Sequence, residues 1–221
     1  MIKTFVCLAN SRKMSGRCVA GKTIDDNQWL RPISSRPTEE IAEIEMRYQN
    51  GINPQLLDII RLELVQHKPN QFQVENHLID HRYYWEKTGE LPVSDLSKLC
   101  NKKTDIWPNL LSTYQGINDR VLPQSLAKFS YSLILLQLAN SKIIVRTEGG
   151  EFGNAKRKVR FQFTIDTTPY LLPVTDPEIE RIYLGKPDDE YPINTIHYVT
   201  ISLGLPHTDG YCYLFAAGII R

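Results

Sequence analysis

The clearest pattern in the chain is a two-residue alternation between residues 158 and 165. Apolar Val159, Phe161, Phe163 and Ile165 alternate with polar Lys158, Arg160, Gln162 and Thr164. Because successive side chains of a strand point to opposite faces, this pattern predicts a strand with one apolar and one cationic, polar face. No apolar run approaches the ~20 residues of a membrane helix. The sequence therefore predicts a mainly β protein.

Similar patterns predict further strands, separated by turn-forming residues. They cover residues 3–9, 17–24, 28–33, 58–67, 71–79, 131–138, 142–147, 158–165, 197–203 and 211–220. Lys68-Pro69-Asn70 favours a hairpin between the fourth and fifth of these strands. Short helical turns are predicted at residues 94–99, 107–112 and 123–128. Asp176-Pro177 predicts the start of another short helix, with either Thr175 or Asp176 as its cap and Pro177 at the first helical position.

The net charge of +1 conceals blocks of alternating sign. Residues 1–37 hold seven basic and two acidic side chains, net +5, and residues 38–130 hold 10 and 13, net −3. Residues 131–166 hold six and three, net +3, and residues 167–221 hold three and seven, net −4. The overall balance argues against a uniformly basic nucleic-acid binder, but it allows a bounded cationic surface.

Four widely spaced cysteines form no Cys-x-x-Cys pair. They are typical of small buried apolar residues in a reducing compartment rather than of a disulfide framework or a zinc site. The mildly apolar N-terminus ends in a polar, basic run, which favours a first strand over a signal peptide. We therefore expect a cytoplasmic protein that is not associated with a membrane.

Short motifs near both ends resemble a known family. They are Val6-Cys7-Leu8-Ala9-Asn10-Ser11-Arg12-Lys13, Gly16-Arg17-Cys18-Val19-Ala20-Gly21, Trp29-Leu30-Arg31-Pro32-Ile33-Ser34, Ser202-Leu203-Gly204, Asp209-Gly210-Tyr211-Cys212-Tyr213 and Ala217-Gly218. In this order they resemble the dual OB-containing domain (DuOB) proteins, a bacterial family often encoded in conflict or defence gene neighbourhoods. The resemblance implies two OB-like barrels, residues 1–92 and 131–221, joined by a partly helical insert at 93–130. It also implies recognition of nucleic acid or a nucleotide, and it transfers no catalytic residues.

Three groups of side chains are candidates for nucleic-acid contact. Residues 10–17 offer amide, hydroxyl and cationic groups between two predicted strands, and such groups bind phosphate oxygens. Trp29 and Arg31 share a face if their segment is extended, so that a base could stack beside a cation. Residues 156–160 form the densest basic cluster, with Phe152 in the neighbouring loop as an additional stacking candidate. The candidate residues are Asn10, Ser11, Arg12, Lys13, Arg17, Trp29, Arg31, Lys156, Arg157, Lys158 and Arg160.

Each group also has an ordinary structural interpretation. The first is then a solvated hairpin loop, Trp29 a core residue, and the third a solvated strand face. For Trp29 the core interpretation is the more expected of the two, and Arg31 is the stronger candidate for contact. The predicted function is non-catalytic binding of nucleic acid, single-stranded or irregular rather than duplex. The alternatives are a nucleotide or small-ligand sensor that uses residues 10–17 as a phosphate pocket, and a protein-interaction module of a multi-component system.

Signals for an enzyme are weak. His77 and His81 have metal-ligand spacing only if their segment is helical, and His207 lies too close in sequence to Cys212 for the usual thiol–imidazole geometry. Phosphate-binding and dinucleotide-binding glycine motifs are absent from the sequence. We therefore expect no catalytic residues, no metal and no cofactor.

Overall fold

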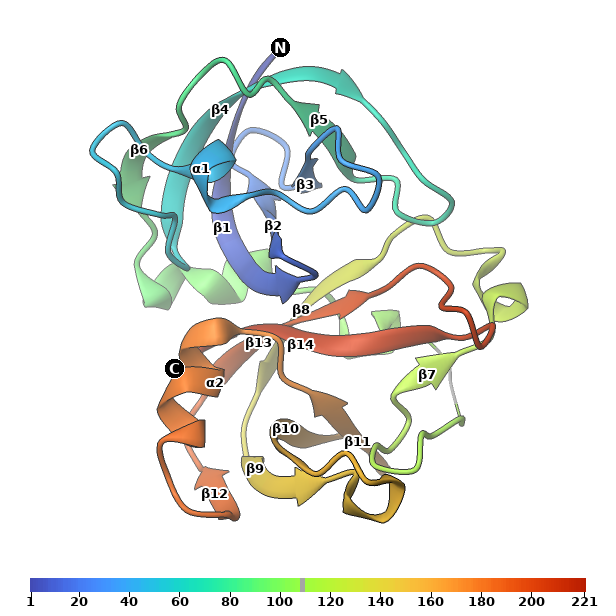
Figure 1. Ribbon diagram of the computed structural model, residues 1–221. Coiled ribbons are helices and arrows are strands. Elements are labelled where there is room, and N and C mark those ends of the chain that lie inside the picture. The colour runs from blue at the N-terminus through green and yellow to red at the C-terminus, as the bar shows by residue number, and fades with distance from the viewer. Residues whose placement is uncertain (108–109) are drawn as a thin grey trace. The chain divides into compact units, whose positions relative to one another are not determined.

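The computed structural model describes residues 1–107 and 110–221, and these form a mainly β protein with short helices (Figure 1). Backbone contacts divide the chain into two units. Unit 1 comprises residues 1–100, 129–133 and 220, and unit 2 comprises residues 101–128, 134–219 and 221. The residues for which the sequence predicts an insert, 93–130, are thus shared between the two units. The helical turn predicted at residues 107–112 falls partly outside the described residues.

Unit 1 contains a closed five-stranded barrel. Its elements are β1 (Ile2–Lys13), β2 (Gly16–Thr23), β3 (Trp29–Ile33), α1 (Glu43–Met46), β4 (Asp58–His67), β5 (Asn76–Ile79), β6 (Glu86–Glu90) and the 3-10 turn η1 (Val93–Leu99). The strands pair in the order β1-β2-β3-β5-β4-β6, and β1 also pairs with β4, which closes the first five into a barrel. β3 and β5 are parallel, and the other neighbours are antiparallel.

The barrel closes because β1 is long and bent. β1 pairs with β2 through residues 5–13 and with β4 through residues 2–6. The register shifts between Cys7 and Ala9, and such a bulge bends a strand. Opposite the bulge, a Cβ added to Gly21 would lie 1.7 Å from the carbonyl oxygen of Val6. Only glycine fits there without a backbone shift.

Apolar side chains fill the barrel interior. The predicted alternation along β4 is confirmed, because Ile60, Leu62 and Leu64 are buried in the core while Arg61 and Val65 are exposed. Residues 10–16, predicted as a loop, are mostly strand. β1 continues to Lys13, and Met14, with a left-handed φ of 49°, forms the turn to β2.

Unit 2 contains two four-stranded sheets. Its elements, counting the strands that lie mainly within it, are η2 (Lys103–Asp105), β7 (Arg120–Val121), η3 (Pro123–Leu126), β8 (Leu133–Leu138), β9 (Ser141–Glu148), η4 (Gly150–Phe152), β10 (Lys156–Ile165), β11 (Thr168–Pro173), α2 (Pro177–Leu184), β12 (Asp189–Ile193), β13 (His197–Leu203) and β14 (Cys212–Ile220). The sheets have the orders β11-β10-β9-β12 and β7-β14-β13-β8. An isolated parallel bridge joins Val174, just after β11, to Ala216 in β14.

Helix α2 begins where the sequence predicts. Asp176 accepts hydrogen bonds from the backbone N–H groups of Glu178 (3.0 Å) and Ile179 (3.3 Å). Its second oxygen accepts from the N–H of Ile219 in β14 (3.1 Å). One carboxylate therefore caps the helix and attaches it to a strand.

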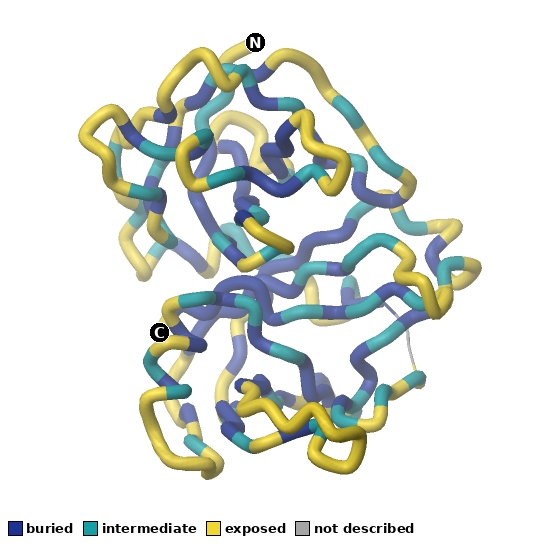
Figure 2. The backbone as a smooth tube through the Cα atoms, viewed as in Figure 1, coloured by how far each residue is buried: buried dark blue, intermediate teal, exposed yellow. Residues whose placement is uncertain are grey.

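Within each unit, buried residues follow the strands and exposed residues gather in the connecting loops (Figure 2). Among the described residues, the helices are too short and too polar to span a bilayer.

Candidate nucleic-acid interface

The β1–β2 hairpin carries the first group of predicted residues to its tip. Arg12 lies opposite Arg17 in the strand ladder, and Lys13 lies opposite Gly16. Arg12 is exposed and Lys13 half-buried, whereas Arg17 forms an ion pair with Glu43 at 2.9 Å. The tip therefore presents cationic side chains at the surface, although Glu43 neutralises one of them.

Asn10 and Ser11 serve the barrel instead. The buried Oγ of Ser11 donates to the carbonyl of Cys18 (3.3 Å), and Nδ2 of Asn10 donates to the carbonyl of Pro54 (2.7 Å). Both side chains hold β1 to neighbouring chain segments. Phosphate contact by these two residues stays a prediction, and the structure gives each side chain a hydrogen-bond partner within the protein.

Arg31 is the largest departure from the predicted site. Its side chain is only 2% exposed, and its guanidinium lies 3.2 Å from the carboxylate of Glu75, which is also 2% exposed. Glu75 accepts a further hydrogen bond from the hydroxyl of Ser132. Ala20 and Lys22, on the same outer face of the barrel, are buried as well. The predicted phosphate contact of Arg31 is therefore replaced by a buried ion pair.

Trp29 lies at the start of β3, outside the apolar core of the barrel. The indole lines a cavity of about 470 Å³, and the ammonium of Lys22 lies 5.5 Å from the ring centroid. Its Nε1 is buried and has no hydrogen-bond partner among the described residues. The structure thus favours the site interpretation of Trp29 over the core interpretation.

The two faces of β10 follow the predicted alternation, but the cationic face is partly covered. Lys158 is exposed, whereas Arg160 is 9% exposed and forms two hydrogen bonds with Glu148, at 2.8 and 2.9 Å. Burial alone would raise the pKa of Glu148, but hydrogen bonds from Arg160 and Arg146 hold that pKa below its ordinary value. Arg160 is therefore an internal anchor and not a surface contact.

Arg157 points to the opposite face of β10 and also has a structural role. Its guanidinium pairs with Asp188 at 2.7 Å and donates to the carbonyls of Leu184 (2.7 Å) and Lys186 (2.5 Å), which lie at and just after the end of α2. Lys156 and Lys158, in contrast, are exposed and form no ion pair with any residue that the structure describes. Of the basic cluster, these two lysines remain available for a ligand.

Two exposed aromatic rings lie at the loop that precedes these lysines in the chain. Tyr114 is 79% exposed and Phe152 is 73% exposed, and their ring centroids are 6.0 Å apart, edge to face. Arg146, directly opposite Lys158 in the β9–β10 ladder, donates to the carbonyl of Gln115 at 2.6 Å. Because opposite residues in a ladder share a face, the contact with Gln115 brings the neighbouring Tyr114 to the face that carries Lys156 and Lys158.

We call Tyr114, Phe152, Lys156 and Lys158 the aromatic–lysine surface. The sequence analysis indicates Phe152, Lys156 and Lys158 as candidates for nucleic-acid contact, but it does not indicate Tyr114. No local pattern distinguishes Tyr114 from other loop tyrosines, because its partner Phe152 is brought to it only by the fold.

His77 and Cys212, two residues considered above for a metal site or a thiol nucleophile, belong to different strands, β5 and β14. His77 packs against His67, with ring centroids 4.7 Å apart and ring planes tilted by 35°, and Nδ1 of His77 lies 2.9 Å from the carbonyl oxygen of Glu75. Burial raises the pKa of the Cys212 thiol to about 11, which disfavours the reactive thiolate. Over the described part of the chain, no three His, Cys, Asp or Glu side chains cluster as metal ligands.

Comparison with known proteins agrees with the sequence motifs. The family model described as "Dual OB-containing domain" matches residues 3–219. No curated protein matches the chain, and no solved structure matches it. The closed barrel of unit 1 is compatible with that description, and the match extends over nearly the whole sequence. The chain belongs to the dual OB-containing domain family.

Proposed function

We propose that the protein binds single-stranded or irregular nucleic acid without catalysing a reaction, and that the aromatic–lysine surface is its principal contact. Bases stack on exposed aromatic rings, and lysines beside them bind phosphates. The observation that carries this proposal is the Tyr114–Phe152 ring pair, exposed by 79% and 73%. It lies at the loop that leads into β10, which carries two lysines without an ion-pair partner among the described residues. Exposed aromatic patches are a feature of binding surfaces.

In this proposal, unit 2 is a second OB-like barrel. Only two residues separate β8 from β9, so that together they take the place of one bent first strand. β9 pairs with β10, β10 pairs with β11, and the Val174–Ala216 bridge leads from β11 to β14. β14 then neighbours β13, which returns to β8. This is the order of the unit 1 barrel, with α2 at the position of α1.

The same correspondence between the two units indicates which loops would form the proposed nucleic-acid interface. OB-folds bind oligonucleotides on the face of strands 2 and 3 and on the loops beside it, including the loop between strands 1 and 2. In unit 1 that face is buried at Ala20 and Arg31, which leaves the β1–β2 tip with Arg12 and Lys13. In unit 2 the equivalent hairpin joins β9 to β10 and carries Phe152. The two hairpin tips are thus equivalent parts of the proposed interface.

Fluorescence anisotropy with labelled single strands of about 20 nucleotides tests the proposal at several salt concentrations. Each lysine–phosphate contact contributes about 0.7 to the slope of log K against log salt for single strands. We therefore expect Lys156→Ala with Lys158→Ala to reduce that slope by about 1.4. A matched control is Lys102→Ala with Lys103→Ala, since these lysines are also exposed and lie in unit 2.

Absence of oligonucleotide binding at about 50 mM salt, where electrostatic binding is strong, would refute the proposal. It would favour the alternative of a protein-interaction module, which predicts co-purification with a partner protein. The oligonucleotide assay therefore separates the nucleic-acid-binding role from the protein-interaction role.

A further inference from the structure

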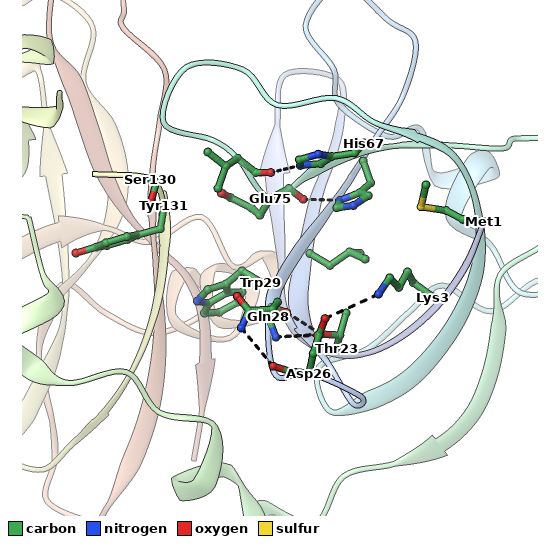
Figure 3. A pocket seen from close by; sticks show the side chains of 13 residues that line it. Met1, Lys3, Thr23, Asp26, Gln28, Trp29, His67, Glu75, Ser130 and Tyr131 are labelled. Carbon is green, nitrogen blue, oxygen red and sulfur yellow. Dashed lines mark hydrogen bonds and ion pairs between the residues drawn. The ribbon is translucent and has the colours of Figure 1, made fainter. Parts of the chain in front are cut away.

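Polar side chains around the cavity that Trp29 lines in unit 1 are bonded to one another (Figure 3). The hydroxyl of Thr23 donates to the carboxylate of Asp26, and Nε2 of Gln28 donates to the backbone carbonyl of Asp26 (3.3 Å). The ammonium of Lys3 lies 4.0 Å from the same carboxylate. Recognition of a base requires polar atoms that keep bonding capacity for a ligand. These groups already use theirs within the protein.

In unit 2, Glu151 keeps such capacity. It is exposed and belongs to η4, the short turn that also contains Phe152. Its Oε1 accepts a hydrogen bond from Nε2 of Gln115 at 3.2 Å. Among the described residues, the carboxylate forms no ion pair and no second side-chain hydrogen bond. Because a carboxylate has about four lone-pair sites, most of its acceptor capacity is available to a ligand.

The Glu151 carboxylate belongs to the same small patch as the exposed rings. The rings of Tyr114 and Phe152 are in contact, with centroids 6.0 Å apart, and the hydrogen bond between Gln115 and Glu151 joins the residues next to them. Since neighbouring Cα atoms are only ~3.8 Å apart, the two contacts lie side by side. A base stacked on this ring pair therefore has its edge near the carboxylate.

Hydrogen bonds hold both segments of this patch in place. The backbone N–H and the hydroxyl of Thr113 donate to the two oxygens of Asp119, at 2.7 and 2.6 Å. On the other segment, the N–H of Phe152 donates to the carbonyl of Gly149 (3.1 Å), and Gly149 has a left-handed φ of 77°. An acceptor that is already held in position loses less freedom on binding, which favours selectivity.

The bases differ in what they present to a carboxylate, which can only accept hydrogen bonds. Guanine presents two adjacent donors, N1–H and the N2 amino group, and can bind both carboxylate oxygens at once. Adenine and cytosine each present one amino group beside an acceptor. The single N–H of uracil lies between two carbonyl oxygens, which a carboxylate repels. The second N–H of the Gln115 amide is a suitable donor to O6 of guanine.

We propose that Glu151 makes the aromatic–lysine surface prefer guanine over the other bases, by accepting from N1–H and N2–H of a base stacked on Tyr114 or Phe152. This preference rests on the proposed function, because it requires a base on the ring pair. A carboxylate repels phosphates and lowers the affinity of a surface for any strand. Glu151 therefore contributes to the choice of base and not to the general attraction of nucleic acid.

Anisotropy titrations with four labelled RNA strands of about 12 nucleotides test this preference. The strands repeat the unit U-U-X, where X is guanine, adenine, cytosine or uracil, so that length and phosphate charge are constant. The guanine strand should bind about tenfold more tightly than the adenine strand, since adenine is a purine without N1–H. Inosine in place of guanine removes the N2 amino group, and should lose most of that gain.

Glu151→Gln keeps the shape of the side chain but removes its charge and one of its two acceptor oxygens. The guanine strand should then bind no more tightly than the adenine strand. The uracil strand should bind this variant at least as tightly as the wild type, because a repulsive charge is lost. Glu178→Gln removes another exposed carboxylate of unit 2, and should keep the preference of about tenfold.

Equal affinity of the wild type for the guanine and adenine strands, or tighter binding of another base, would overturn the preference while leaving the proposed function intact. A folded Glu151→Gln protein that still prefers guanine would overturn it as well. A change of all four affinities by one common factor would assign Glu151 a purely electrostatic effect. If none of the four strands binds, the proposed function fails, and the preference fails with it.

Discussion

The guanidinium of Arg31 lies 3.2 Å from the carboxylate of Glu75, and both side chains are 2% exposed. Loss of one partner of such a pair leaves the other charge buried without compensation. We expect Arg31→Met to reduce the free energy of unfolding by about 3–5 kcal/mol. Urea denaturation followed by circular dichroism measures the change.

Two comparisons isolate the cause. Arg31→Met combined with Glu75→Leu removes both charges, and should be more stable than Arg31→Met alone. Arg61→Met breaks an exposed pair with Glu86 (2.9 Å), and should cost less than about 1 kcal/mol. Equal losses for Arg31→Met and Arg61→Met would contradict the role assigned to the buried pair.

Gly21→Ala should be strongly destabilising. The new Cβ would lie 1.7 Å from the carbonyl oxygen of Val6 and 2.6 Å from Cδ2 of Phe5, so the β1–β2 ladder would have to shift. We expect a loss of about 3 kcal/mol or more in the free energy of unfolding. In Gly89→Ala the nearest atom would be Cδ1 of Ile59 at 3.5 Å, an ordinary contact, and the same measurement should show a small change.

Because His197 is buried, we expect the folded protein to lose stability in mild acid. The His197 side chain is fully buried, its Nε2 lies 2.9 Å from Oγ of Ser141, and burial lowers its pKa. The unfolded chain therefore takes up a proton below pH ~6.5 that the folded chain resists. This contribution to stability is complete above that pH and declines as the pH falls toward the lower pKa of the folded state.

Calorimetric Tm values at pH 7.5 and 5.5 test this prediction. His197→Asn should be less stable at pH 7.5 but should lose less Tm between the two pH values than the wild type. The buried His77 contributes with the same sign, so part of the pH dependence should remain in this variant. His207→Asn is the exposed control, and its Tm should follow the wild type at both pH values.

The aromatic pair predicts a loss of affinity that does not depend on salt. Stacking of one base contributes about 1–3 kcal/mol. Tyr114→Ala and Phe152→Ala should each weaken binding of single strands by about that amount while the salt slope stays at its wild-type value. A control is Tyr84→Ala, which removes a 63% exposed tyrosine from unit 1. Wild-type oligonucleotide affinity in both unit 2 variants would rule out stacking on this pair.

Much of the fold follows from local sequence signals. Strands β4 and β13 have the predicted bounds, and α2 starts at the predicted cap, because alternation and capping act over a few residues. Strand β6 was not predicted. All of its side chains are polar or glycine, and it becomes a strand only by pairing with the edge of β4. The information that makes residues 86–90 a strand therefore lies in β4, a different part of the chain.

The site was predicted less well, and the reason is physical. Alternation along a strand identifies which residues share a face, but not what covers that face. Arg31, Arg157 and Arg160 have the composition of a cationic surface, yet Glu75, Asp188 and Glu148 neutralise them. These acids are 44, 31 and 12 residues away in sequence. Only the folded chain shows which arginines are already paired.

The buried outer face of β2 and β3 limits how unit 1 could contribute to the proposed function. With that face closed, unit 1 keeps only the tip of the β1–β2 hairpin for contact with a nucleic-acid strand. Under the proposed function, tight binding would require simultaneous contact with this tip and with the aromatic–lysine surface, since the second contact is made at a high effective concentration. Affinity should then rise abruptly, not gradually, as an oligonucleotide is lengthened. The length at which it rises would give the number of nucleotides needed to reach both contacts.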